Sequence, residues 1–177
     1  MAEEEKTHES AMEEEKEWYE EEFPDKWWFQ ISWIRQKTET EPSGLMLFID
    51  YMLDQAIITP EAVKIASLIP HRLVLIEIVH PKKKLIERLS FMISPTSVTP
   101  DIPDTEPDLI IRISYYDIAK FLLGKASFSE SFFLGRGEIF GNVLALIDIA
   151  DILEVAQGKK MDQAKEARPK IWPVGFP

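Results

Sequence analysis

The side chains with the greatest capacity for chemistry are three histidines and two aspartates. His71 and His80 are nine residues apart, so on an extended strand they would lie about 30 Å apart, too far to share a zinc ion. His8 belongs to an acidic stretch. Asp148 and Asp151 could share a helical face as a carboxylate pair. The isoleucines and leucines around them are more typical of an amphipathic helix on which the two aspartates form the solvent-exposed edge.

No motif of a catalytic class is present. Gly135 and Gly137 lead into a predicted strand, whereas a dinucleotide-binding glycine motif joins a strand to a helix. Neither a nucleophile elbow nor a phosphate-binding loop occurs. The chain has no cysteine, which excludes disulfides and thiolate metal sites. We therefore predict no catalytic residue, no metal site and no cofactor, and expect a protein that is not an enzyme.

Apolar binding is the chemistry that remains. Seven large apolar residues lie close together in the second half of the chain: Phe128, Phe132, Phe133, Leu134, Ile139, Leu144 and Ile147. By pattern alone they are ordinary core of a folded domain. The alternative is that they surround a cavity for an apolar ligand, and periodicity cannot separate these two interpretations.

Five consecutive elements must position these side chains, and each has signals at its ends. The boundary residues are Ser114 with Asp117 and Ser127 with Glu130 as capping boxes, Asn142 as a further cap, and Gly124, Gly135 and Gly158 as helix stops. The sequence therefore predicts a strand at 109–114, helices at Tyr115–Leu123 and Phe128–Leu134, a strand at Gly137–Gly141 and a helix at Val143–Ala156.

Two glycine motifs in this region carry a family resemblance. Gly124 and Lys125 end the first helix, and the run LGRGEIFGN at 134–142 precedes the last apolar helix. Residues 108–155 thereby resemble the C-terminal half of the sterol carrier protein type-two family of lipid-transfer domains. The chain departs from the family pattern at Leu144, where a small residue is common, and at Ala150, near a common polar position.

The resemblance implies an apolar tunnel between a sheet and its covering helices. The residues that it implies as the lining are Ile111, Ile113, Phe121, Phe128, Phe132, Phe133, Ile139, Val143, Leu146, Ile147 and Ala150. The implied ligand is a lipid, a fatty-acyl group or another apolar molecule.

The preceding residues predict the other half of such a domain. Helices are expected from Gly44 to Ala56 and from Pro60 to Leu68, and strands at Arg72–His80, Lys84–Ile93 and Ser97–Thr99, the first two forming a hairpin. The predicted fold class is α/β of the α+β type, a roughly five-stranded, mostly antiparallel sheet covered by helices. We place the domain at 43–158, after an acidic arm at 1–22 and an aromatic-rich extension at 23–42, and before a proline-rich tail at 159–177.

The net charge of −11 is concentrated in the acidic arm. Residues 1–22 hold eleven Glu and two Lys, a charge of −9, which leaves −2 for the rest of the chain. Without a basic patch, nucleic acid is not an expected partner. No apolar run reaches the roughly 18–20 residues that span a bilayer, and the acidic start is unlike a signal peptide. We expect a cytoplasmic protein.

Aromatic residues are concentrated between residues 18 and 33, which include four of the five tryptophans. Such a cluster either packs as an extra layer on the core or forms a surface for a protein partner or a second copy of the chain. Membrane binding is disfavoured because the nearby glutamates would be repelled by anionic headgroups. The candidate partner-binding residues are Trp18, Trp27, Trp28, Trp33 and, in the tail, Trp172.

These observations favour non-catalytic binding or transfer of a lipid in an internal tunnel, either as a lipid carrier or by presenting the ligand to an enzyme. The alternative is an accessory subunit of a metabolic enzyme complex, with the cavity closed. In that case the tryptophan-rich segment and the C-terminal tail would dock on the partner.

Overall fold

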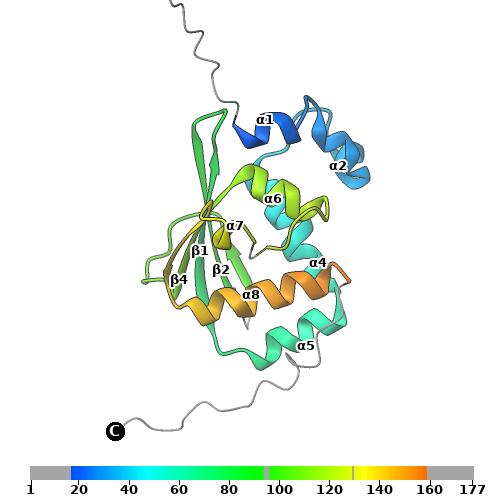
Figure 1. Ribbon diagram of the computed structural model, residues 1–177. Coiled ribbons are helices and arrows are strands. Elements are labelled where there is room, and N and C mark those ends of the chain that lie inside the picture. The colour runs from blue at the N-terminus through cyan, green and yellow to red at the C-terminus, as the bar shows by residue number, and fades with distance from the viewer. Residues whose placement is uncertain (1–16, 94–95, 129, 159–177) are drawn as a thin grey trace, which may run out of the picture.

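The computed structural model describes residues 17–93, 96–128 and 130–158. Within them, a five-stranded sheet is covered on one face by helices (Figure 1). The strands are β1 (Arg72–His80), β2 (Leu85–Ile93), β3 (Ser97–Thr99), β4 (Leu109–Ser114) and β5 (Glu138–Gly141). The helices are α1 (Trp18–Glu22), η1 (Trp27–Gln30), α2 (Ser32–Lys37), α3 (Gly44–Leu47), η2 (Phe48–Leu53), α4 (Asp54–Ile58), α5 (Pro60–Leu68), α6 (Tyr115–Leu122), α7 (Glu130–Phe133) and α8 (Val143–Ala156).

The strand order is β3-β2-β1-β4-β5. β1 pairs antiparallel with β2 and parallel with β4, and the two outer pairs, β2 with β3 and β4 with β5, are antiparallel. The predicted fold class, an α+β domain with a mostly antiparallel five-stranded sheet, is confirmed. The predicted hairpin of β1 and β2 and the short strand β3 are also present.

Alternation along the strands separates the two faces of the sheet. On β4, Leu109, Ile111 and Ile113 are at most 2 % exposed, while the residues between them are half-buried. On β1, Val74 and Ile76 lie on the same helix-covered face and are fully buried. This is the pattern expected of a sheet with one face in the core.

The opposite face of the sheet carries a ladder of ion pairs. Glu77 on β1 accepts hydrogen bonds from Arg88 on β2 (2.8 Å) and Arg112 on β4 (2.9 Å), and Arg112 donates a further one to Glu138 on β5 (2.8 Å). Burial alone would raise the pKa of Glu77, but the hydrogen bonds from the two arginines outweigh it and hold the pKa below its ordinary value.

The predicted helix ends agree closely with the structure in the second half of the chain. α8 has the predicted bounds, with the Asn142 side chain accepting from the Leu144 amide (3.0 Å). Gly124 and Gly135 have φ of +68° and +69°, as left-handed helix stops require. α7 is shorter than predicted. At the start of α6, Asp117 does not complete the capping box predicted with Ser114, because its carboxylate accepts a hydrogen bond from Arg136 instead (2.9 Å).

The helix predicted from Gly44 is longer and less regular than expected. It begins as predicted, with Ser43 Oγ accepting from the Met46 amide (3.0 Å), but Phe48–Leu53 is π-helical and the chain stays helical to Ile58. The spacing of apolar residues at 45–56 does not predict the wider turn, because a π-helical segment rotates side chains around the helix axis without changing the residue types.

Candidate functional site

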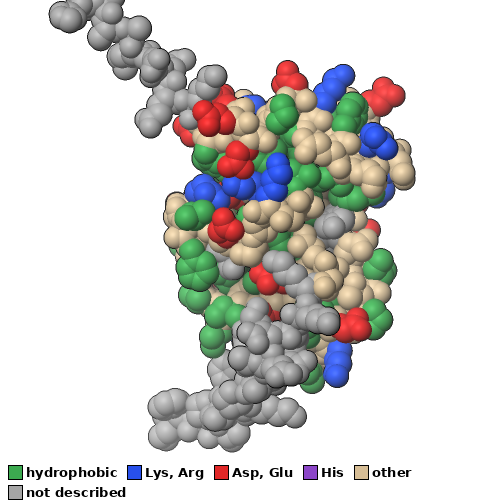
Figure 2. Space-filling model, turned by 45° about the vertical axis from the view of Figure 1, so that its right-hand side comes forward, with side chains coloured by type: hydrophobic (Ala, Val, Ile, Leu, Met, Phe, Trp, Pro, Cys, Tyr) green, Lys and Arg blue, Asp and Glu red, His purple; other side chains and the backbone are tan. Residues whose placement is uncertain are grey.

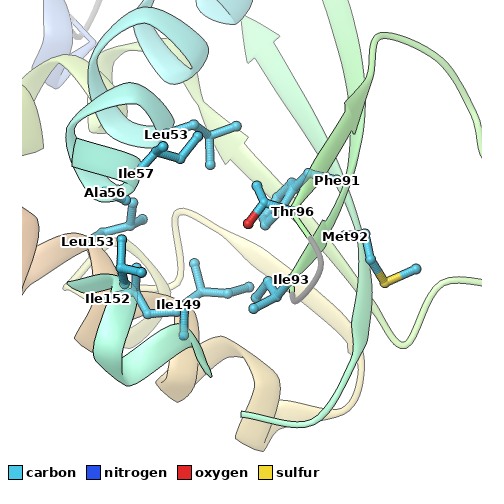
Figure 3. Close-up of a pocket in the computed structure, with 12 residues that line it drawn as sticks. Leu53, Ala56, Ile57, Phe91, Met92, Ile93, Thr96, Ile149, Ile152 and Leu153 are labelled. Carbon is cyan, nitrogen blue, oxygen red and sulfur yellow. The ribbon is translucent and has the colours of Figure 1, made fainter. Parts of the chain in front are cut away.

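An apolar pocket of about 380 Å³ lies between the sheet and the helices at the end of the domain where α4, α5 and α8 meet β2. Figure 3 shows side chains of α4 and α8 facing Phe91 and Ile93 of β2 across this space, whereas the Met92 side chain points away. The described lining residues are Leu53, Ala56, Ile57, Val63, Ala66, Phe91, Met92, Ile93, Thr96, Ile149, Ile152 and Leu153.

Irregular helix geometry builds one wall of the pocket. Leu53 is the last residue of the π-helical segment, and Ala56 and Ile57 follow it on α4, so three lining residues lie at or just after the widened turn. Such segments are rare and often occur at functional sites. Thr59 then turns the chain, its hydroxyl donating to the Gln55 carbonyl (2.7 Å), and Pro60 starts α5 with its required φ.

The lining offers apolar contact and almost nothing else. Eleven of the twelve described lining residues are apolar, Thr96 is the polar one, and none of the twelve is ionisable. Ile57 and Val63 are 51 % and 46 % exposed, so they lie where the pocket meets solvent. The volume falls within the roughly 300–1,000 Å³ usual for small-molecule sites. The arrangement suits contact with an apolar molecule.

None of the eleven predicted tunnel residues is among the described lining residues of this pocket. Six of them are buried in the core: Ile111, Ile113, Phe121, Phe128, Leu146 and Ala150. Phe132 and Ile139 are partly buried against it. Ile147, Val143 and Phe133 are 38 %, 56 % and 88 % exposed. The last two side chains lie at the surface because α7 and the first turn of α8 are at the edge of the helical layer, not inside it.

The described pocket and the predicted tunnel thus involve different parts of α8, and the predicted lining stays a prediction. On α8 the pocket is lined by Ile149, Ile152 and Leu153, in the second half of the helix. The other wall comes from α4 and α5 and includes Val63. A hydrophobic pattern indicates which side of a helix faces inward, but not where two inward faces fail to meet.

The tryptophan cluster forms an extra layer on α6. Trp27 is 2 % exposed and packs edge-on against Tyr115, with ring centroids 5.9 Å apart. Tyr19 stacks on Tyr116 at 4.8 Å, and Lys120 of α6 pairs with Glu22 at 2.9 Å. The pKa values of Tyr115 and Tyr116 are raised well above the ordinary value of a tyrosine, mainly because the side chains are buried and to a smaller extent because carboxylates lie nearby.

This packing bears on the predicted partner-binding residues. Trp18, Trp28 and Trp33 are partly buried against the core, so much of their apolar surface is already used within the chain. Trp172 lies outside the described residues. Figure 2 shows Lys, Arg, Asp and Glu side chains intermingled over the upper part of the face in view, so no field of a single sign marks that face.

His80 is a structural residue between the sheet and α6. It is 2 % exposed, stacks on Tyr115 at 4.3 Å, and accepts a hydrogen bond from the Lys83 amide on Nδ1 (3.3 Å). Burial lowers the pKa of His80, although Glu41, with a carboxylate oxygen 3.6 Å from Nε2, acts in the opposite direction. Its partner in the zinc hypothesis, His71, is exposed at the other end of the strand.

Two further features concern only the described part of the chain. Among residues 17–93, 96–128 and 130–158, no group of three or more His, Cys, Asp or Glu side chains has the geometry of a metal site. None of the helices described is both long and apolar enough to cross a bilayer.

The fold and the pocket together define an α+β domain with an apolar pocket between its sheet and its helices. Solved structures of this architecture include the sterol carrier protein domain 2 of Helicoverpa armigera, with a TM-score of 0.52 and 15 % sequence identity over 71 % of this chain and 98 % of that one. Palmitated SCP2L2 from Aedes aegypti has a TM-score of 0.50 and 11 % identity over 63 % and 95 % of the two chains.

These likenesses show that the chain has the sterol carrier protein 2 fold, as the glycine motifs suggested. No protein-family model matches the sequence, and no curated protein matches it. At such low identities the comparison concerns the fold and carries no residue roles.

Proposed function

We propose that this chain binds one apolar molecule, a fatty-acyl chain or a comparable lipid, in the pocket between α4, α5, α8 and β2. It carries or presents this molecule without catalysing a reaction. The observation that carries the proposal is the lining: eleven of the twelve described lining residues are apolar and none is ionisable, around a volume of about 380 Å³. Burying apolar ligand surface there is favourable, whereas a charged ligand group would find no partner.

The expected affinity is moderate. A ligand of about 20 heavy atoms at roughly 0.3 kcal/mol per atom gains about 6 kcal/mol, which corresponds to a dissociation constant of tens of micromolar. Such binding releases the ligand quickly enough for exchange, and it suits carriage better than storage.

The shared fold supports this proposal indirectly. The Aedes aegypti protein of the same fold is described as palmitated. A fatty-acyl molecule is therefore the first ligand to test with this chain.

Fluorescence titration tests the proposal directly. Delipidated protein is titrated with a dansyl-labelled fatty acid, and bound probe is then displaced by unlabelled palmitate. We expect saturable binding with about one site per chain and complete displacement. A signal that does not saturate, or that palmitate does not reverse, would contradict a defined apolar site.

An accessory role remains a second candidate because of one observation. Six large apolar residues on α7, β5 and the first half of α8, with their flanking turns, are between 38 % and 88 % exposed: Phe133, Leu134, Phe140, Val143, Leu144 and Ile147. Exposed apolar surface of this kind often marks contact with another protein. Native mass spectrometry of the protein purified from its source separates the proposals, since bound lipid supports the first and a stoichiometric partner the second.

A further inference from the structure

β5 is an edge strand of the sheet, and it lacks the features that protect the opposite edge. The sheet ends at β3 on one side and at β5 on the other. β3 reads SVT and runs directly into Pro100 and Asp101, and prolines and charges commonly keep an edge strand from pairing. β5 reads EIFG and has no proline beside it, and its one charged residue, Glu138, is paired with Arg112. Among the described residues, no strand pairs with the outer side of β5.

Apolar side chains lie beside β5 on both faces of the sheet. Phe140 comes two residues after Glu138, so it lies on the face of the ion-pair ladder, where it is 50 % exposed. On the helix-covered face, α8 begins with five consecutive apolar residues, VLALI. A helix that is apolar around its whole circumference is normally buried, yet Val143 and Leu144 in this first turn are exposed. The edge strand and the start of α8 together form one surface that favours a further strand and further apolar contact.

We propose that this surface joins two copies of the chain, with their β5 strands antiparallel across a twofold axis at Phe140. Identical strands can pair in this way because the same groups meet from both sides of the axis. Phe140 then lies opposite its own copy, and Glu138 lies opposite the polar residue Asn142. The start of α8 in one chain lies opposite the turn before β5 in the other, which contains Leu134. This inference goes beyond lipid binding and does not depend on it.

The available area is close to what a stable dimer needs. The exposed apolar residues around β5, here called the β5 patch, are Phe133, Leu134, Phe140, Val143, Leu144 and Ile147. At about 200 Å² for a whole phenylalanine and somewhat less for an aliphatic residue, their exposed parts amount to roughly 600 Å² per chain. Standard interfaces bury about 800 Å² per partner, and the outer backbone of β5 adds to the patch. An interface of this size fits a dissociation constant of about 10 μM.

Charge does not oppose the pairing. The β5 patch contains no ionisable side chain. In the proposed register each Glu138 is four positions along the strand from its own copy, a distance of about 13 Å, and Arg112 of the same chain holds it at 2.8 Å. A charged partner would have to bury its charge against apolar side chains, which costs free energy. A second copy of the chain brings an apolar surface of the same shape and size to each side of the axis.

Sedimentation equilibrium of the delipidated full chain measures the association. We expect twice the mass of one chain at about 100 μM and dissociation towards single chains at about 1 μM. Phe140→Lys places two like charges opposite each other at the axis and should weaken the association at least about tenfold. The matched control is Val98→Lys, the same change at an exposed apolar residue of the other edge strand, and it should associate as the unaltered chain does.

Two results of this experiment would overturn the proposal. If the unaltered chain stays monomeric at about 100 μM, which is far above the expected dissociation constant, the patch belongs to a different occupant. If Phe140→Lys associates as strongly as Val98→Lys does, the contact between chains lies elsewhere.

Cysteine crosslinking tests the position of the axis without a charged substitution. The chain has no cysteine, so Phe140→Cys introduces one thiol, and its copy would lie directly opposite at a Cα separation of about 5 Å, which a disulfide can bridge. A copper–phenanthroline oxidant should join Phe140→Cys chains rapidly and Val98→Cys chains slowly. Equal rates for the two variants would overturn the proposed axis. Because neither experiment contains lipid, a failure of lipid binding would refute the proposed function and leave the dimer intact.

Discussion

Enlarging a side chain inside the pocket distinguishes an open space from a packed core. Ala66 and Ala62 lie on α5, but only Ala66 lines the pocket, while Ala62 is 0 % exposed and lies within the core. Replacing each with Leu changes helix propensity very little. The two variants therefore differ mainly in what the added carbons meet.

The structure gives opposite signs for the two changes. In Ala66→Leu the added carbons enter free space, where about three methylene equivalents at roughly 0.8 kcal/mol each gain up to ~2 kcal/mol. Lost rotamer freedom offsets ~0.5–1 kcal/mol of this, which leaves a net stabilisation of about 1 kcal/mol. In Ala62→Leu the same carbons overpack a closed core and should cost about 1–3 kcal/mol.

Urea unfolding of the delipidated variants measures these differences, and titration with the labelled fatty acid measures the effect on binding. The Ala66→Leu side chain takes space from about three ligand atoms, so binding should weaken by about 1 kcal/mol, or roughly fivefold. If Ala66→Leu destabilises the protein as much as Ala62→Leu does, there is no usable space between α5 and α8 and the reasoning is refuted.

Three further predictions concern the scaffold. Trp27→Ala should cost about 3–5 kcal/mol in urea unfolding because Trp27 is 2 % exposed; a neutral change would mean that its contacts with α6 are dispensable. Gly141→Val should cost well over about 1 kcal/mol, because Gly141 has φ of +100° and a Cβ there would meet the Asp108 carbonyl at 2.5 Å; an unchanged melting temperature would contradict this. The lowered pKa of Glu77 means that its stabilisation is complete above its unfolded value of about 4.3 and is lost as the pH falls through the folded value. Glu77→Gln should therefore lose part of the acid-induced fall in the urea midpoint, and an unchanged pH profile would count against the ion-pair ladder.

Local signals predicted the fold well where each residue's role depends on near neighbours. Asn142 and Gly135 mark their helix ends because capping and left-handed φ are properties of a few adjacent residues. The strands were equally readable, since the alternation at 109–114 directly reflects one buried face.

The site was harder to predict because it depends on how separate helices fail to fill the space between them. Val63 and Ile152 are 89 residues apart in the sequence and look like core in their own helices. Their roles follow from the π-helical segment that ends at Leu53 and from the extended backbone at Thr59, neither of which the hydrophobic pattern predicts. The family resemblance predicts an apolar space between sheet and helices, and the described pocket lies in that layer with a different set of lining residues.

The position of β1 between β2 and β4 also has a consequence for the order of folding. β1 and β2 are separated by only four residues and pair along nine positions, so this hairpin can form within microseconds, before distant contacts are made. β4 starts almost thirty residues after β1 ends, and its parallel pairing must first close that long loop. Until β4 arrives, the nascent hairpin presents the central strand of the finished sheet as an open edge. Early folding intermediates are therefore where we expect this chain to be most prone to self-association.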